Sequence, residues 1–184
     1  MKSKFKVLAL IAIIVVVLIG GGFAYDQLSN RYSTPGEPST SAQPTPVIAP
    51  DFTVKDAEGN SVSLSDFQGK PVVINFWASW CGYCTDEMPL FQEIYKDYGE
   101  QAAFMMINLT DGSRETLKSA KSFIEDKGYT FPVYFDTELE AAYAYNTYSI
   151  PVTYFIDANG NIAASIQGIA TKSKLLNKIE TILQ

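Results

Sequence analysis

Two cysteines, Cys81 and Cys84, stand where an apolar run gives way to a helical pattern. The run at residues 71–77 is almost continuously apolar, as in a strand that is covered on both faces of a sheet. A helical pattern follows from about Tyr83 to Tyr98. Two cysteines three positions apart can close a disulfide on one helical turn. This junction predicts an α/β fold whose chemistry is concentrated at the two sulfur atoms.

The absence of histidine from the sequence excludes several kinds of site. A Ser/His/Asp triad, a Cys/His protease and a His-ligated metal or haem site all need that residue. The 184 residues carry 14 Lys and Arg against 20 Asp and Glu, which gives a formal net charge of −6. This acidic balance argues against a nucleic-acid partner, because phosphate binding depends on clustered Lys and Arg. Carboxylates and sulfur remain to carry the chemistry.

Residues 1–28 have the pattern of a membrane anchor or a signal segment. Lysines within the first six residues precede an uncharged apolar run at residues 7–25. About 20 apolar residues span a bilayer as a helix, whereas the apolar region of a secretory signal usually holds about 7–15. The length favours a single-pass anchor, but residues 22–24 resemble a cleavage site, so secretion after cleavage remains an alternative. In both cases the lysines hold the N-terminal end in the cytoplasm and place the rest of the chain outside it.

Residues 29–50 have the composition of a linker, with many Pro, Ser and Thr and few charges. Such a stretch cannot bury enough apolar area to offset its ordering entropy, and its prolines favour extended conformations. We expect it to separate a folded domain, residues 51–184, from the membrane.

The folded domain alternates strand-like with helix-like segments, which indicates an α/β sheet. A hairpin pattern at residues 52–64 is expected to extend the sheet at its edge. Ser113 is the expected N-cap of a helix that runs to Lys127. The other predicted elements are strands at 103–109, 131–135, 152–157 and 162–167, and helices at 138–145 and 171–182.

Cys81 is the expected nucleophile of the pair. It stands at a helix N-terminus, where unpaired N–H groups and the positive end of the dipole favour a thiolate. The thiolate is the attacking species in thiol-disulfide exchange, so Cys84 is the expected resolving thiol. A zinc site would need more ligands than the chain offers, and haem attachment would need a histidine where the sequence has Thr85. A purely structural disulfide remains an alternative, although so short a loop would stabilise the fold little.

Four motifs together resemble one family. They are Val-Ile-Asn-Phe-Trp-Ala-Ser-Trp-Cys at residues 73–81, Cys-Gly-Tyr-Cys at 81–84, Glu-Met-Pro at 87–89 and Ile-Pro-Val-Thr at 150–153. This set resembles the thioredoxin-like thiol-disulfide oxidoreductases of the membrane-anchored TlpA/ResA type. The resemblance implies a thioredoxin fold, a central mixed sheet flanked by helices, with an N-terminal β-hairpin extension and a central insertion within residues 113–135.

The resemblance also assigns roles to residues outside the cysteine pair. It implies a cis Pro151 that faces the cysteines, and contacts with the substrate from Trp80, Ile150 and Pro151. Glu87 matches a glutamate that this type of protein keeps near its active site, so we expect it to serve as a base. The alternative for Glu87 is a solvated charge in the first turns of the helix. Asn75 stands where cytoplasmic thioredoxins have a proton-relaying aspartate, and an amide cannot relay protons in that way.

These features predict a membrane-tethered enzyme that reduces protein disulfides outside the cytoplasm, with the Cys81–Cys84 disulfide as its redox centre and no other cofactor. Tyr83 adds no cation beside the thiols, so the disulfide is expected to be reducing, below about −200 mV. The resemblance suggests a membrane thiol-electron donor, and clients such as apocytochrome c, a methionine sulfoxide reductase or a peroxidase. A redoxin-type thiol peroxidase is an alternative, but its Thr-x-x-Cys centre has Ala78 in place of the threonine. A non-catalytic binding module locked by the disulfide is another.

Overall fold

The computed structural model describes residues 20–22, 25, 27 and 46–184. The chain divides into two compact units, residues 1–44 and 45–184. The few described residues of the first unit are helical. Among all residues described, no helix is long and apolar enough to cross a membrane. Most of the predicted membrane segment, residues 7–25, lies outside the described residues.

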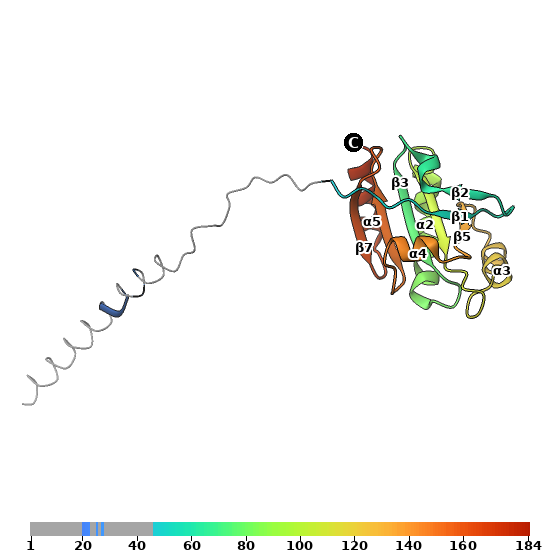
Figure 1. Ribbon diagram of the computed structural model, residues 1–184, viewed down its shortest axis with the longest axis horizontal. Coiled ribbons are helices and arrows are strands. Elements are labelled where there is room, and N and C mark those ends of the chain that lie inside the picture. The colour runs from blue at the N-terminus through green and yellow to red at the C-terminus, as the bar shows by residue number, and fades with distance from the viewer. Residues whose placement is uncertain (1–19, 23–24, 26, 28–45) are drawn as a thin grey trace, which may run out of the picture. The chain divides into compact units, whose positions relative to one another are not determined.

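A seven-stranded mixed sheet forms the centre of the second unit, with the strand order β2-β1-β5-β4-β3-β6-β7 (Figure 1). Parallel pairing joins β3 to β4 and β4 to β5, and the other neighbours are antiparallel. The predicted mixed sheet is therefore confirmed. The strands are β1 (Thr53–Lys55), β2 (Ser61–Ser63), β3 (Val72–Trp77), β4 (Ala103–Asn108), β5 (Val133–Phe135), β6 (Val152–Ile156) and β7 (Ile162–Gln167).

Helices cover both faces of this sheet. One face packs against α2 (Gly82–Tyr98), α3 (Leu117–Lys127) and α5 (Lys172–Ile182), and the other against η1 (Leu64–Phe67) and α4 (Glu140–Ala144).

The central strand β3 contributes to both cores, because successive side chains of a strand point to opposite faces. Val73 and Trp77 belong to the core on the α2 side, and Ile74 and Phe76 to the core on the α4 side. The same alternation places Asn75, between Val73 and Trp77, on the face that α2 covers.

The predicted hairpin and insertion are both present and contact each other. β1 pairs with β2 and, through Lys55, with Phe135 of β5, so the hairpin extends the sheet as expected. The insertion supplies α3 and β5. Lys121 of α3 donates a hydrogen bond of 2.6 Å to the carbonyl oxygen of Ala57 in the hairpin turn. The two additions to the sheet thus lie side by side.

The expectation that Ser113 caps α3 is wrong. Thr116 is the N-cap, and its hydroxyl oxygen accepts the backbone N–H of Ser119 at 3.1 Å. Oδ1 of Asp111 accepts the backbone N–H of Ser113 at 2.8 Å and those of the next two residues, which makes a turn of this segment. Both Ser113 and Thr116 have a hydroxyl suited to capping, so local sequence alone does not choose between them.

The chain enters the second unit at the end of the sheet opposite the cysteines. Ile48 forms a β-bridge with Asn161 in the turn between β6 and β7. β6 is antiparallel to β3, so its last residue, Ile156, pairs with Val72, the first residue of β3. The cysteines follow the other end of β3.

Candidate active site

The two cysteines form a disulfide at the N-terminus of α2. Their Cα atoms lie 5.2 Å apart, within the usual range for a disulfide. Cys81 is the N-cap, and its sulfur accepts the backbone N–H of Cys84 at 3.2 Å. The exposed fraction is 7% for Cys81 and 0% for Cys84. Of the two, only Cys81 is open to attack from solvent.

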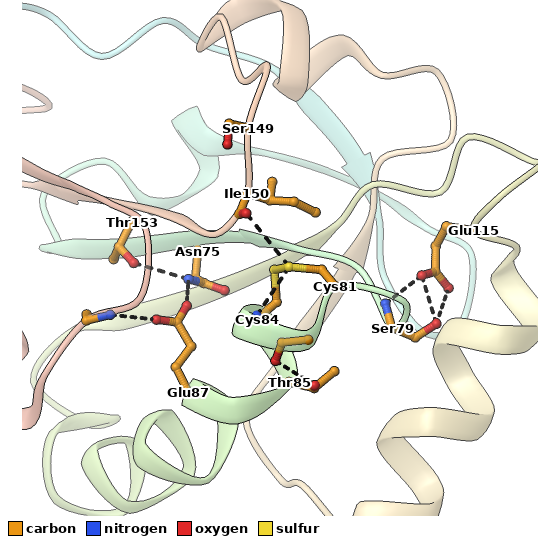
Figure 2. The surroundings of a disulfide bond; sticks show 12 residues. Asn75, Ser79, Cys81, Cys84, Thr85, Glu87, Glu115, Ser149, Ile150 and Thr153 are labelled. Atoms are coloured by element: carbon orange, nitrogen blue, oxygen red, sulfur yellow. Dashed lines mark hydrogen bonds between the residues drawn. A yellow bond between two sulfur atoms is a disulfide. The ribbon is translucent and has the colours of Figure 1, made fainter.

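The loop before β6 lies against the disulfide (Figure 2). The Ile150–Pro151 peptide bond is cis, which confirms the expected geometry. The sulfur of Cys81 lies 3.8 Å from the carbonyl oxygen of Ile150. Trp80, the residue before Cys81, is 40% exposed. The structure thus brings the sequence-predicted substrate contacts Trp80, Ile150 and Pro151 to the surroundings of Cys81, the more exposed of the two cysteines.

Glu87 is buried beneath the disulfide, so the alternative of a solvated charge is wrong. Its exposed fraction is 2%. Oε1 accepts a hydrogen bond of 2.9 Å from Nδ2 of Asn75, and Oε2 accepts one of 3.0 Å from the backbone N–H of Ala170. Nδ2 of Asn75 also donates to Oγ1 of Thr153 at 3.1 Å (Figure 2). One carboxyl group therefore links α2, β3 and the segment before α5.

Burial changes the acidity of this carboxyl group. Loss of solvation raises the pKa of Glu87 to about 6, against the opposing effect of the hydrogen bonds from Ala170 and Asn75. A group with this pKa is mainly ionised at pH 7 and can still take up a proton at little cost. Glu87 is thus suited to general acid-base work.

A second buried carboxyl group, Glu115, lies on the other side of the disulfide (Figure 2). Its exposed fraction is 0%. Oε2 accepts the backbone N–H of Ser79 at 2.6 Å and its hydroxyl at 2.9 Å, and Oε1 accepts the hydroxyl of Ser119 at 2.8 Å. Glu115 thereby fixes the segment that leads into Cys81. Sequence reasoning missed this residue, because it lies in a turn where no periodic pattern marks a buried position.

Arg114 reaches the same segment from the insertion. Its guanidinium carbon lies 3.5 Å from the centroid of the Trp80 ring, a cation-π contact. The sequence offers no cation within the Cys-Gly-Tyr-Cys motif, and the structure brings one to the residue next to it. The guanidinium makes no hydrogen bond to either sulfur atom in the described part of the chain.

The chain is similar in sequence and in structure to known thioredoxin-like proteins. Residues 47–165 match the model of the AhpC/TSA family. The chain is 33% identical over 184 residues to the thiol-disulfide oxidoreductase ResA of Geobacillus kaustophilus, covering 99% of each chain. Among solved structures, StoA from Bacillus subtilis superposes with a TM-score of 0.62 at 27% identity, over 72% of this chain and 98% of that one. The exposed lipoprotein thioredoxin Etrx1 of Streptococcus pneumoniae gives 0.64 at 28% identity, over 71% and 98%.

Substitution of Glu87 by Gln should remove a pH-dependent part of the stability. Folding raises the pKa of Glu87 from its ordinary 4.5 to about 6, so the folded protein binds a proton that the unfolded chain releases between these values. The resulting stabilisation is present below pH 4.5 and is lost as the pH rises through about 6, a change of about 2 kcal/mol. Denaturant unfolding of the oxidised wild type and Glu87→Gln at pH 4 and pH 7 measures it. A difference between the two proteins that is independent of pH would contradict the assignment.

Substitution of Glu115 by Ala should destabilise the protein by about 1–3 kcal/mol, because the N–H and hydroxyl of Ser79 lose their acceptor. Glu115→Gln keeps one acceptor oxygen and should cost less. Glu125→Ala removes an exposed carboxylate from α3, the helix that follows Glu115, and should change stability by no more than about 0.5 kcal/mol. The free energy of unfolding checks all three variants. Equal effects of Glu115→Ala and Glu125→Ala would show that Glu115 does not fix the segment before Cys81.

Proposed function

Because the chain belongs to the AhpC/TSA family and is a thiol-disulfide oxidoreductase related to ResA over its whole length, we propose that it reduces protein disulfides outside the cytoplasm while tethered to a membrane. The observation that carries the direction of the reaction is Glu87, a buried carboxyl group with a pKa of about 6, one turn along α2 from the buried Cys84.

The reaction consists of two exchanges of sulfur partners. The Cys81 thiolate attacks one sulfur of the client disulfide and forms a mixed disulfide, while the other client sulfur leaves as a thiolate and takes up a proton. The Cys84 thiolate then attacks the sulfur of Cys81, which re-forms the Cys81–Cys84 disulfide and releases the second client sulfur. The client gains two electrons and this pair loses two. A thiol-electron donor in the membrane would restore them.

Glu87 supports the second exchange by taking the proton of Cys84. Cys84 is 0% exposed in the oxidised protein, so bulk water has poor access to its sulfur. Glu87 lies three residues later on the same helix face, and its carboxylate is mainly ionised at pH 7 because its pKa is about 6. Of the two buried carboxyl groups in the site, Glu87 is the one on the same helix as Cys84, so it is the proposed acceptor of this proton.

Asn75 suits both protonation states of Glu87. Its Nδ2 donates to the ionised carboxylate at 2.9 Å, while its buried Oδ1 has no partner among the described residues. If the amide turns over when Glu87 is protonated, this oxygen can accept the new O–H. An aspartate at position 75 would instead place a second negative charge against Glu87.

The N-terminal sequence supports the tethered arrangement. The apolar run at residues 7–25 has the length of a bilayer span, and its flanking lysines favour an extracytoplasmic domain. One relative is described as an exposed lipoprotein. Because Ile48 already pairs with Asn161 of the domain, the spacer is shorter than residues 29–50, and its contour length is at most about 60 Å.

The kinetic test separates the two exchanges. Glu87→Gln should slow resolution of the mixed disulfide by at least about tenfold, because it lacks the base, while the initial attack by Cys81 changes much less. Asp86→Asn, an exposed neighbour on the same helix, is the matched control and should resolve at the wild-type rate. Single-turnover reduction of a disulfide client, quenched by alkylation, resolves both steps, with Cys84→Ala as the trapped mixed-disulfide standard. Equal rates of mixed-disulfide resolution in Glu87→Gln and Asp86→Asn would show that Glu87 has only a structural role. Faster consumption of peroxide than of the disulfide client by the wild type would favour the peroxidase alternative.

The topology has a separate test. The protein should fractionate with membranes, and protease added to intact protoplasts should release a fragment that contains Cys81 and Cys84. The apolar run and the lysines before it are the physical reason. Recovery of a soluble protein that begins near Tyr25 would show a cleaved signal instead of an anchor.

A further inference from the structure

Arg114 presents unpaired hydrogen-bond donors at the rim of the disulfide. Its guanidinium lies over the ring of Trp80, which directly precedes Cys81. Within residues 46–184, the guanidinium makes no salt bridge or hydrogen bond to the protein. Arg114 is exposed, and Trp80 is 40% exposed. A charged, planar group with several free N–H donors therefore lies over the side chain that directly precedes Cys81 in sequence.

Two carboxylates hold Arg114 in this place from within its own loop. Oδ1 of Asp111 accepts the backbone N–H groups of Arg114 at 2.8 Å and Glu115 at 3.0 Å. These hydrogen bonds lower the pKa of Asp111. Glu115, the next residue, is bonded to Ser79, the residue before Trp80. Arg114 precedes Glu115 and Trp80 follows Ser79, so the Glu115–Ser79 hydrogen bond fixes the backbone beside both residues of the stack. Because the two residues are held in place before a ligand binds, less conformational entropy is lost on binding.

Two helix ends near the stack favour an anion, while the carboxylates of Asp111 and Glu115 in the same loop are occupied by hydrogen bonds within the protein. α2 begins immediately after Cys81, and α3 begins at Leu117, three residues after Arg114. The N-terminus of a helix carries partial positive charge, so two such ends lie next to the stack in sequence. The chain as a whole has a net charge of −6, so the positive charge of Arg114 at this stack contrasts with the acidic balance of the protein. The fork of a guanidinium matches a carboxylate in particular.

We propose that Arg114 and Trp80 form a subsite that binds the carboxylate of an Asp or Glu flanking the reactive cysteine of the client. The carboxylate accepts hydrogen bonds at the edge of the guanidinium, in the plane of its N–H groups, while the Trp80 ring supports one face of the guanidinium. Arg114 thereby selects among clients and leaves the exchange of sulfur partners to Cys81 and Cys84. This inference rests on the proposed function, because it names a property of the clients at the same site.

The test uses two cyclic peptides that each contain one disulfide and differ only in a Glu or a Lys beside the same cysteine. At low ionic strength, the wild type should reduce the Glu peptide with a kcat/KM about fivefold higher than the Lys peptide. Arg114→Gln should bring this ratio close to one. Lys118→Gln removes an exposed positive charge four residues further on and should keep the wild-type ratio. The wild-type ratio should also fall as salt is added.

Other outcomes would overturn the inference without touching the proposed function. Equal rates for the two peptides in the wild type would show that no acidic subsite exists. An Arg114→Gln variant that slows both peptides equally would mean that Arg114 only supports Trp80. If the wild type reduces neither peptide, the proposed direction fails, and the same ratio is then measured for oxidation of the two reduced peptides. A ratio near one in that direction would also overturn the subsite.

Discussion

The buried carboxyl group of Glu87 is the contact on which the candidate site depends. It joins α2 to β3 through Asn75 and to the segment before α5 through Ala170. Burial of an ionisable group is costly, and here the cost takes the form of a pKa raised to about 6. The same cost creates a group that can exchange a proton near neutral pH beneath Cys84. The fold and the proposed proton transfer therefore depend on the same carboxyl group.

Glu115 complements Glu87 from the other side of the disulfide. Glu87 lies within the core that α2 and the sheet form, whereas Glu115 comes from the insertion and binds Ser79, just before Trp80 and Cys81. The insertion thus does more than enlarge the sheet. It fixes the segment that leads into Cys81 through Glu115, and it places Arg114 against the ring of Trp80. One carboxylate is suited to proton exchange and the other to holding the geometry.

Much of the fold follows from patterns in the sequence, because apolar runs such as residues 71–77 report burial directly. The spacing of Glu87 from Cys84 placed both on one helix face, but its burial depends on Asn75 and Ala170, which are distant in sequence. The cis Pro151 was predictable only through the family resemblance. Ser113 was mistaken for a cap because Asp111 draws its backbone into a turn. Glu115 and Arg114 were missed because their partners, Ser79 and Trp80, are distant in sequence. The N-terminal anchor stays a prediction.

The central claim is that this pair of thiols donates electrons to clients. The N-terminus of α2 and the backbone N–H of Cys84 favour a Cys81 thiolate, but no cation adds to their effect. Tyr83 supplies none between the cysteines, the carboxylate beneath them is anionic, and the Arg114 guanidinium makes no hydrogen bond to sulfur in the described chain. The redox equilibrium of the Cys81–Cys84 pair against dithiothreitol or glutathione tests this most directly. The account predicts a potential below about −200 mV at pH 7. A value near the roughly −120 mV of a strong oxidant such as DsbA would contradict it.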